Sequence, residues 1–452
     1  MDAYSQALLL DIPVVLICTA LLVFVGGLRF AHPATPYLVF HIHTVTTRLF
    51  GLLTGGTTLF SYPVWRGNYF PVQPEEIQRA ALYSDVVLIT MTAVWLWLGR
   101  RSKRALVAES RAQRAVPASM LNEQIVRTVI AVSFVIGIIG LIIGAQIPGF
   151  GVNERLAQFG EWGSSSYLLI IQMWSGLALL AYFYVNGFRP KAVALFVLFL
   201  LIMAYQGYHR FRVVIPLLLA VQIWLDRRDR PWPPWRMTLL LAAGAVAFFP
   251  LKIIGVMARE GSGLSAIAEE VTSAMTAVAA GTAPDQMFLD QMASALTLLD
   301  IQGRMYLGSM YLPLLTLPIP RQFWPDKPGL ATFLVEVSIP ERPMSQNGMI
   351  ATFIGESYAN LGQLGIVVVP ALFAIGLTVF YAQAYRRDFG SVVRFAYALV
   401  SVNLIQVYRD GLVSLVTFTF VNMMPLTAIV LAHMAEAFLK RHKQSFGYSR
   451  SR

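Results

Sequence analysis

Polar and charged side chains gather in three short stretches of a chain that is otherwise mostly apolar. The first stretch, YQGYHRFRVVIP at 205–216, places His209, Arg210 and Arg212 within four residues. Burying arginine beside an apolar helix is costly and usually marks a ligand or ion path. Because arginine holds phosphate through two parallel hydrogen bonds, we interpret this stretch as an anion-binding turn. The alternative is that both arginines extend to lipid headgroups.

The second stretch, PIPRQFWPDKPG at 318–329, carries four prolines that fix much of its backbone. Such a segment loses little entropy when it holds Arg321 and Lys327 in place to bind a phosphate. Phe323 and Trp324 would either stack on a sugar ring or anchor the chain at the membrane interface. We interpret this stretch as part of a rigid binding loop.

The third stretch runs from Arg342 to 365 and reads RPMSQNGMIATFIGESYANLGQLG. Thr352, Glu356 and Asn360 follow one another at intervals of four, so they share one face of a predicted helix. A carboxylate between a hydroxyl and an amide can act as a general base, which makes Glu356 a candidate catalytic residue and the neighbouring Asn360 a candidate substrate-binding residue. The alternative is a polar face that solvates the top of the helix.

The composition places these stretches in a membrane protein. Of 452 residues, 56% are hydrophobic and 13% are charged, whereas soluble domains carry about 25% charged residues. The apolar residues form runs of about twenty, which is the length that crosses a bilayer. We predict an all-α, polytopic fold with one integral domain over 1–452. Its expected spans, about eleven in number, lie at 10–28, 36–58, 80–99, 125–147, 166–187, 191–207, 212–225, 237–257, 364–384, 391–408 and 412–438.

The orientation of these spans follows from their basic residues. Lys and Arg fill alternate connections, including the basic loop at 100–123, so this set is predicted to be cytoplasmic. The N-terminus is then outside and the C-terminus inside. We expect the first apolar run to be retained as a span, because the chain starts without a basic signal-peptide region.

One long outer connection, 258–363, separates the eighth and ninth predicted spans. Apolar residues spaced at three and four over 264–278 and 288–299 predict two amphipathic helices, which we expect on the membrane surface. Outer loops are normally poor in Lys and Arg, yet several lie on this side. These outer basic residues predict an anionic substrate such as a pyrophosphate. The residues are Arg210, Arg212, Arg259, Arg304, Arg321, Lys327, Arg342 and Arg409. Arg409 is alternatively one half of an ion pair with Asp410.

The sequence lacks the motifs that identify several classes of enzyme. There is no GxxxxGK[ST] and no HExxH, which argues against a P-loop ATPase and a zinc protease. The single cysteine, Cys18, cannot form a disulfide within the chain. We therefore expect neither a metal ion nor a cofactor, and no nucleic-acid partner.

The second and third stretches together resemble the Wzy-type O-antigen polymerases, which join oligosaccharide repeat units. In that family a proline-rich outer segment with Arg, Trp and DKP precedes a GE-x-Y-x-N-x-G-x-x-G segment. Here the second pattern falls on Gly355, Glu356, Tyr358, Asn360, Gly362 and Gly365. The turn at 209–212 is similar to the arginine-bearing outer turn of the family. The resemblance implies a membrane fold like that of the C-type glycosyltransferases, in a bacterial inner membrane.

The resemblance also implies an activity. A glycan on undecaprenyl pyrophosphate would be transferred, on the periplasmic face, to the non-reducing end of a new lipid-linked repeat unit. Undecaprenyl pyrophosphate would leave, stabilised by arginines such as Arg321 in place of a metal ion. Glu356 or His209 would accept the proton of the attacking hydroxyl. A chain-length regulator and a flippase remain open as protein partners.

Three other functions stay open at this point. An O-antigen ligase would use the same donor and transfer the glycan to a lipid A core. A flippase or other transporter would place charges in the middle of its spans, where Lys252 is the main charge that we identify. A lipid-binding structural protein is the third alternative, with no specific feature in its favour.

Overall fold

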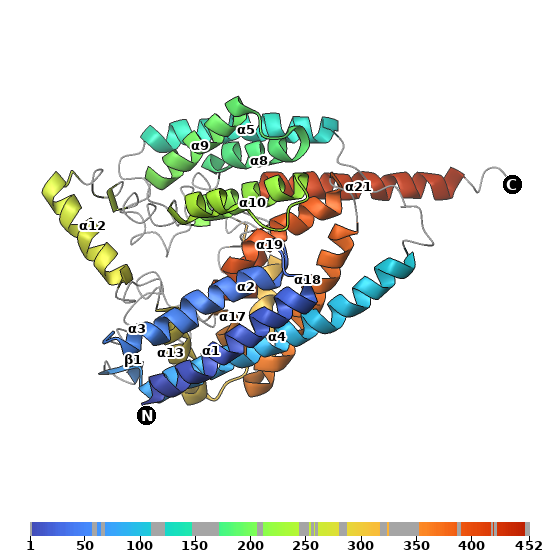
Figure 1. Cartoon of the computed structure of the whole chain (residues 1–452). Coiled ribbons are helices and arrows are strands. Elements are labelled where there is room, and N and C mark those ends of the chain that lie inside the picture. Colours follow the sequence, from blue (N-terminus) through green and yellow to red (C-terminus); the bar gives the residue numbers. More distant parts are fainter. Residues whose placement is uncertain are drawn as a thin grey trace. The chain divides into compact units, whose positions relative to one another are not determined.

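In the part of the chain that the computed structural model describes, the secondary structure is helical apart from one short hairpin (Figure 1). The chain divides into two compact units. Unit 1 comprises Met1–Lys103, Gly263–Val379 and Leu404–Val416, and unit 2 comprises Arg104–Ser262, Phe380–Asn403 and Thr417–Arg452. The structure describes residues 2–56, 61–64, 68–109, 123–146, 171–205, 211–243, 253–254, 257, 261–279, 287–316, 323–324, 352–386, 390–416, 419 and 423–447.

Unit 1 begins with two helical segments that each contain a π-helical turn. Helix α1 (Ala3–Leu21) starts at Asp2, whose Oδ1 accepts a hydrogen bond from Ser5 N at 2.7 Å. It widens into η1 (Leu22–Gly26). The second segment runs without a break through α2 (Ala34–His41), η2 (Ile42–Thr46) and α3 (Thr47–Leu53). Helix α3 packs against α1.

A small hairpin then leads into the long helix α4. Strands β1 (Ser61–Val64) and β2 (Asn68–Pro71) pair antiparallel. Helix α4 (Pro74–Glu109) starts with a proline, which has no N–H that would need a partner in the first turn. It extends beyond the predicted span at both ends, and Gln78 Nε2 donates to Gln6 Oε1 of α1 at 3.1 Å.

The remaining elements of unit 1 surround one buried helix. Helix α13 (Phe288–Gln302) confirms the predicted helix at 288–299, but nearly all of its residues are buried. The expectation of a surface helix is therefore wrong for α13, because its polar residues pair inside the unit. Helix α12 (Leu264–Ala279) is mostly exposed. The other described elements are η4 (Ser309–Tyr311), α14 (Leu312–Thr316), α17 (Thr352–Leu361), η5 (Gly362–Leu364), most of α18 (Gly365–Tyr385), and α20 (Leu412–Val416).

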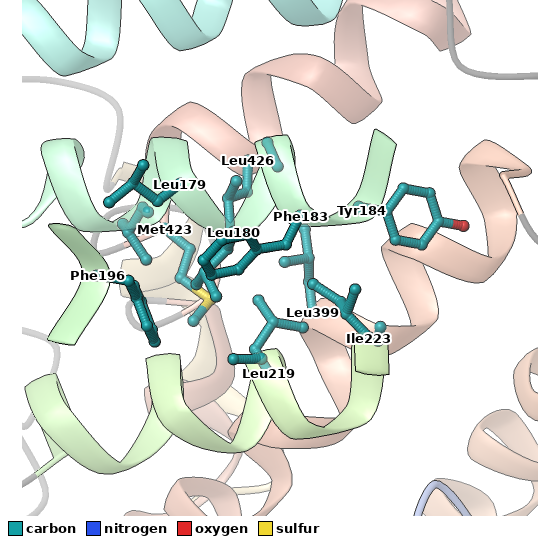
Figure 2. Close-up of a cluster of buried hydrophobic side chains, with 14 of the residues drawn as sticks. Leu179, Leu180, Phe183, Tyr184, Phe196, Leu219, Ile223, Leu399, Met423 and Leu426 are labelled. Carbon is teal, nitrogen blue, oxygen red and sulfur yellow. The ribbon is translucent and has the colours of Figure 1, made fainter. Parts of the chain in front are cut away.

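Unit 2 contains a core of large apolar side chains (Figure 2). Phe183 and Leu180 of α8 meet Leu219 of α10 and Leu426 of α21 in this cluster. Gly137 of α5 lies so close to the backbone of Ser175 of α8 that a larger residue would not fit, which lets these two helices approach closely. The helices of this unit in the described residues include α5 (Glu123–Gln146), α8 (Trp174–Asn186), α9 (Pro190–Tyr205), α10 (Phe211–Arg227), most of α19 (Val392–Asp410), and α21 (Met424–Gly447).

Four helices in the described part of the chain are long and apolar enough to cross a membrane. They are Ala3–Val25, Pro74–Gly99, Glu123–Ile143 and Thr352–Tyr385, and Pro190–Ala204 and Met424–Glu436 are shorter apolar helices. Large apolar side chains such as Leu16 (63% exposed) and Phe24 (86% exposed) on the first of these suit contact with lipid. The chain is thus a membrane protein, while eleven spans and a periplasmic loop at 258–363 remain predictions.

The structure describes most of the helix predicted at 412–438, as α20 (Leu412–Val416), the helical Thr419 and α21 (Met424–Gly447). Residues 417, 418 and 420–422 of this predicted span lie outside the described part. Of the span predicted at 237–257, residues 244–252, 255 and 256 lie outside the described part.

Candidate functional site

Helix α17 carries the predicted polar face at the start of a candidate span. Thr352 has a positive φ of 61° and accepts a hydrogen bond from Gly355 N through Oγ1 at 3.3 Å, as a helix-capping residue does. Asn360 Nδ2 donates to the Glu356 carbonyl oxygen at 2.8 Å, one turn away. The prediction that Thr352, Glu356 and Asn360 share one helix is confirmed.

The Glu356 carboxylate is buried, with only 3% of the residue exposed. Its Oε2 accepts a hydrogen bond from Leu412 N at 2.7 Å. Its Oε1 has no hydrogen-bond partner among the described residues. The Tyr311 hydroxyl lies near this carboxylate, and burial together with the charge of Glu356 raises the pKa of Tyr311. Leu412 N thus donates to one oxygen of this buried carboxylate, and the Tyr311 hydroxyl and the Val413 N–H also lie close enough to interact with the carboxylate.

Asn360 fixes the loop that carries Tyr311. Its Oδ1 accepts from Gly308 N at 2.7 Å, and its Nδ2 donates to the Tyr311 hydroxyl at 3.1 Å. Backbone bonds from Tyr306 N to Ala359 O (2.9 Å) and from Leu307 N to Asn360 O (3.1 Å) complete the attachment. Asn360 thus positions this loop, and its role as a substrate contact stays a prediction.

Arg409 and Asp410 end helix α19, immediately before Gly411. Arg409 Nε lies 3.2 Å from Asp410 Oδ1, which favours the ion-pair interpretation. The Arg409 guanidinium also lies over the Phe288 ring, with 5.4 Å between Cζ and the ring centroid. Gln406 Nε2 donates to Asp410 Oδ2. Arg409 is therefore engaged within unit 1, two residues from the glycine that contacts Glu356.

The other predicted site residues are only partly described. Arg212 is half-buried in the first turn of α10, in unit 2. Trp324 is 39% exposed, and the exposed Arg304 lies over the Tyr306 ring at 5.0 Å. His209, Arg210, Arg259, Arg321, Lys327 and Arg342 lie outside the described residues. A shared pocket of arginines therefore remains a prediction.

A buried ion pair that the sequence interpretation missed joins α3 to α13. Arg48 donates to both oxygens of Asp290, at 3.3 Å from Nε and 2.6 Å from Nη2, and both side chains are fully buried. Burial raises the pKa of Asp290, and the Arg48 guanidinium opposes this shift. The available signal was the position of Arg48 inside the apolar run predicted at 36–58.

Three further contacts attach the other end of α13 to its neighbours. Asp300 pairs with Arg79 of α4 and accepts a hydrogen bond from the Tyr358 hydroxyl of α17. Thr297 Oγ1 donates to Glu76 Oε1 at 2.9 Å. These contacts show why α13 is an interior helix of unit 1.

A second missed feature is a buried cluster of Asp11, His41 and Asp85, contributed by α1, α2 and α4. His41 Nε2 lies 2.7 Å from Asp11 Oδ1 and 3.4 Å from Asp85 Oδ1. All three residues are buried, with exposed fractions of 0% for Asp11, 1% for His41 and 3% for Asp85. The expectation that Lys252 is the main charge in a span is therefore wrong, because two candidate spans bury these aspartates. An aspartate in each apolar run was the available signal.

Comparison of the chain with family models, with curated proteins and with solved structures finds no match. The polymerase resemblance therefore rests on the motifs of this chain, and the site is argued from its own residues.

Proposed function

We propose that this protein is a polysaccharide polymerase that joins oligosaccharide units carried on undecaprenyl pyrophosphate. It acts on the periplasmic face of a bacterial inner membrane and releases undecaprenyl pyrophosphate. The observation that supports this proposal is the buried Glu356, which has one oxygen held by Leu412 N and the other without a hydrogen-bond partner among the described residues. It lies within the GESYANLGQLG segment that resembles the polymerases.

The reaction needs a base and a group that stabilises the departing anion. The acceptor hydroxyl attacks the anomeric carbon of the donor sugar, the bond from that carbon to the pyrophosphate oxygen breaks, and the hydroxyl proton passes to the base. Glu356 is our first candidate for the base that accepts this proton, and His209 is the other candidate. Arg210 and Arg321 would stabilise the pyrophosphate oxygens, with Arg212, Arg259, Lys327 and Arg342 as further contacts.

The burial of Glu356 sets a condition on this mechanism. At 3% exposure, its carboxylate cannot meet an acceptor hydroxyl unless neighbouring side chains move. Tyr311 lies beside the carboxylate on a loop that Asn360 holds through two side-chain hydrogen bonds. Movement of this loop would expose the base when substrate arrives, which makes the loop part of the proposed mechanism.

A polymerisation assay tests this function. The purified chain in lipid nanodiscs receives synthetic lipid-pyrophosphate repeat units, without added divalent cations, and the products are separated by size. We expect a ladder that Arg210→Ala and Arg321→Ala abolish. Arg127→Ala is the matched control, because Arg127 is exposed and pairs with Glu123 one turn away. Absence of a ladder for the wild type contradicts the function, whereas normal ladders in both variants contradict only the proposed arginine site.

Transport is the second candidate, and the cluster of Asp11, His41 and Asp85 favours it. Ionisable groups buried in membrane spans often mark ion or substrate paths. A transporter would move a fluorescent lipid-pyrophosphate glycan across the membrane of a proteoliposome without lengthening it. The two assays therefore separate transport from polymerisation.

A further inference from the structure

In the cluster of Asp11, His41 and Asp85, two buried carboxylates lie around one imidazole, and the Thr46 hydroxyl is a further neighbour of Asp11. One imidazole nitrogen, His41 Nε2, faces two carboxylates, but it carries at most one N–H. That hydrogen serves Asp11 Oδ1 at 2.7 Å, while Asp85 Oδ1 lies 3.4 Å from the same nitrogen. Among the described residues, Asp85 Oδ1, Asp11 Oδ2 and His41 Nδ1 have no hydrogen-bond partner. Unsatisfied carboxylate oxygens at such depth are costly.

A divalent cation satisfies these groups together. We propose that Asp11, His41 and Asp85 bind a divalent transition-metal ion of the zinc class inside unit 1. Two carboxylates and a neutral imidazole with one such ion have no net charge, which suits an apolar interior. The ion replaces the proton between Nε2 and Asp11 and gives Asp85 Oδ1 a partner.

The spacing of the ligand atoms fits a single ion. One nitrogen and two oxygens, from the three residues, lie within 4.8 Å of one another. Ligands bound at their usual distances from zinc lie about 3.0–3.5 Å apart. The observed separations of 2.7 and 3.4 Å from His41 Nε2 need only a small side-chain shift.

The type of ligand selects the class of ion. Magnesium and calcium prefer shells made wholly of oxygen, whereas imidazole suits zinc, cobalt and other first-row transition metals. Three protein ligands leave a fourth position for water, as in many zinc sites. The histidine is the last residue of α2, immediately before the π-helical turn η2, and such turns are frequent at functional sites.

Binding would connect three helices of unit 1 through one ion. Asp11 lies in α1, His41 in α2 and Asp85 in α4, and the first and last belong to candidate membrane spans. Metal binding is therefore expected to raise the thermal stability of the folded chain.

The test uses the purified full chain in detergent with Zn²⁺ or Co²⁺ as the probe. We expect one ion per chain by mass spectrometry, visible d–d bands with Co²⁺, and a higher unfolding temperature with Zn²⁺. Asp85→Asn should weaken Co²⁺ binding by more than about 100-fold, since loss of an outer-shell partner alone costs 10–100-fold. Ser84→Ala is the matched control, because Ser84 is buried next to Asp85 but its Oγ bonds Ala80 O.

Asp85→His covers the case in which Asp85→Asn does not fold. It retains a ligand at this position, so it should keep Co²⁺ bound while the visible bands change. Wild-type protein that binds neither ion above the level of Asp85→Asn, or that Zn²⁺ does not stabilise, would overturn the proposal. Equal loss in Ser84→Ala would also overturn it. None of these measurements requires polymerase activity, so they fail or succeed independently of the proposed function.

Discussion

Gly411 lies directly against the Glu356 carboxylate and leaves no room for a Cβ atom at position 411. The φ of Gly411 is +91°, a conformation that L side chains rarely adopt. This turn brings the N–H of Leu412 to Oε2 of Glu356 at 2.7 Å. Glycine is therefore required here both by the backbone and by the carboxylate, and the turn after α19 is shaped around Glu356.

Gly411→Ala should destabilise unit 1. The positive φ alone costs an alanine about 1–2 kcal/mol, and the overlap with Oε2 adds to this cost. Thermal unfolding in detergent measures the effect. Gly376→Ala is the matched control, because Gly376 lies in α18 with open space at its Cβ position and should tolerate or gain from alanine. Equal unfolding temperatures for the two variants would show that Gly411 is not constrained as described.

Glu356→Gln separates a catalytic from a structural role for this side chain. A glutamine carbonyl oxygen can still accept the hydrogen bond from Leu412 N, so the fold should be retained. It cannot accept a proton as a base, and polymerisation should fall by about 10²–10⁴-fold. Glu123→Gln makes the same change at an exposed position and should leave the rate unchanged. A Glu356→Gln protein with nearly normal ladders would assign Glu356 a structural role and leave His209 as the candidate base.

Helices such as α1, α4 and α5 could be predicted from their runs of apolar residues, because such a run is a local pattern. The spacing of Thr352, Glu356 and Asn360 likewise predicted correctly that they lie on one face of a single helix. Periodicity tells which face of a helix is apolar, but it does not identify the partner of that face. The 288–299 stripe therefore predicted a helix, but not that its polar residues such as Asp290 and Ser294 would also be buried.

The missed pairs are separated widely along the chain. Arg48 and Asp290 are 242 residues apart, and Asp11 and His41 are 30 apart. A charged residue in an apolar run indicates that it needs an oppositely charged partner in the folded protein. Several charged residues elsewhere in the sequence are equally suitable partners. The partner is fixed by helix packing, which one sequence does not specify.

Asn360→Ala should release the loop that carries Tyr311. The change leaves Gly308 N without its acceptor and removes the donor to the Tyr311 hydroxyl, at a cost of about 1–3 kcal/mol. Amide hydrogen exchange over 306–311 should become faster. Gln363→Ala is the control, since Gln363 is exposed in the adjacent η5. Unchanged exchange in Asn360→Ala would mean that the backbone bonds of Tyr306 and Leu307 hold the loop without the side chain.

Asp290→Ala should be among the most destabilising single changes in unit 1. It leaves the fully buried Arg48 guanidinium without its bidentate partner, and breaking a buried pair in this way costs about 3–5 kcal/mol. Arg48→Met combined with Asp290→Leu should recover most of the loss, because apolar side chains of similar volume need no partner. The double-mutant cycle, measured by thermal unfolding, gives the coupling between the two positions. Additive losses would show that the pair is not coupled, and α13 would then be held in place mainly by its apolar residues.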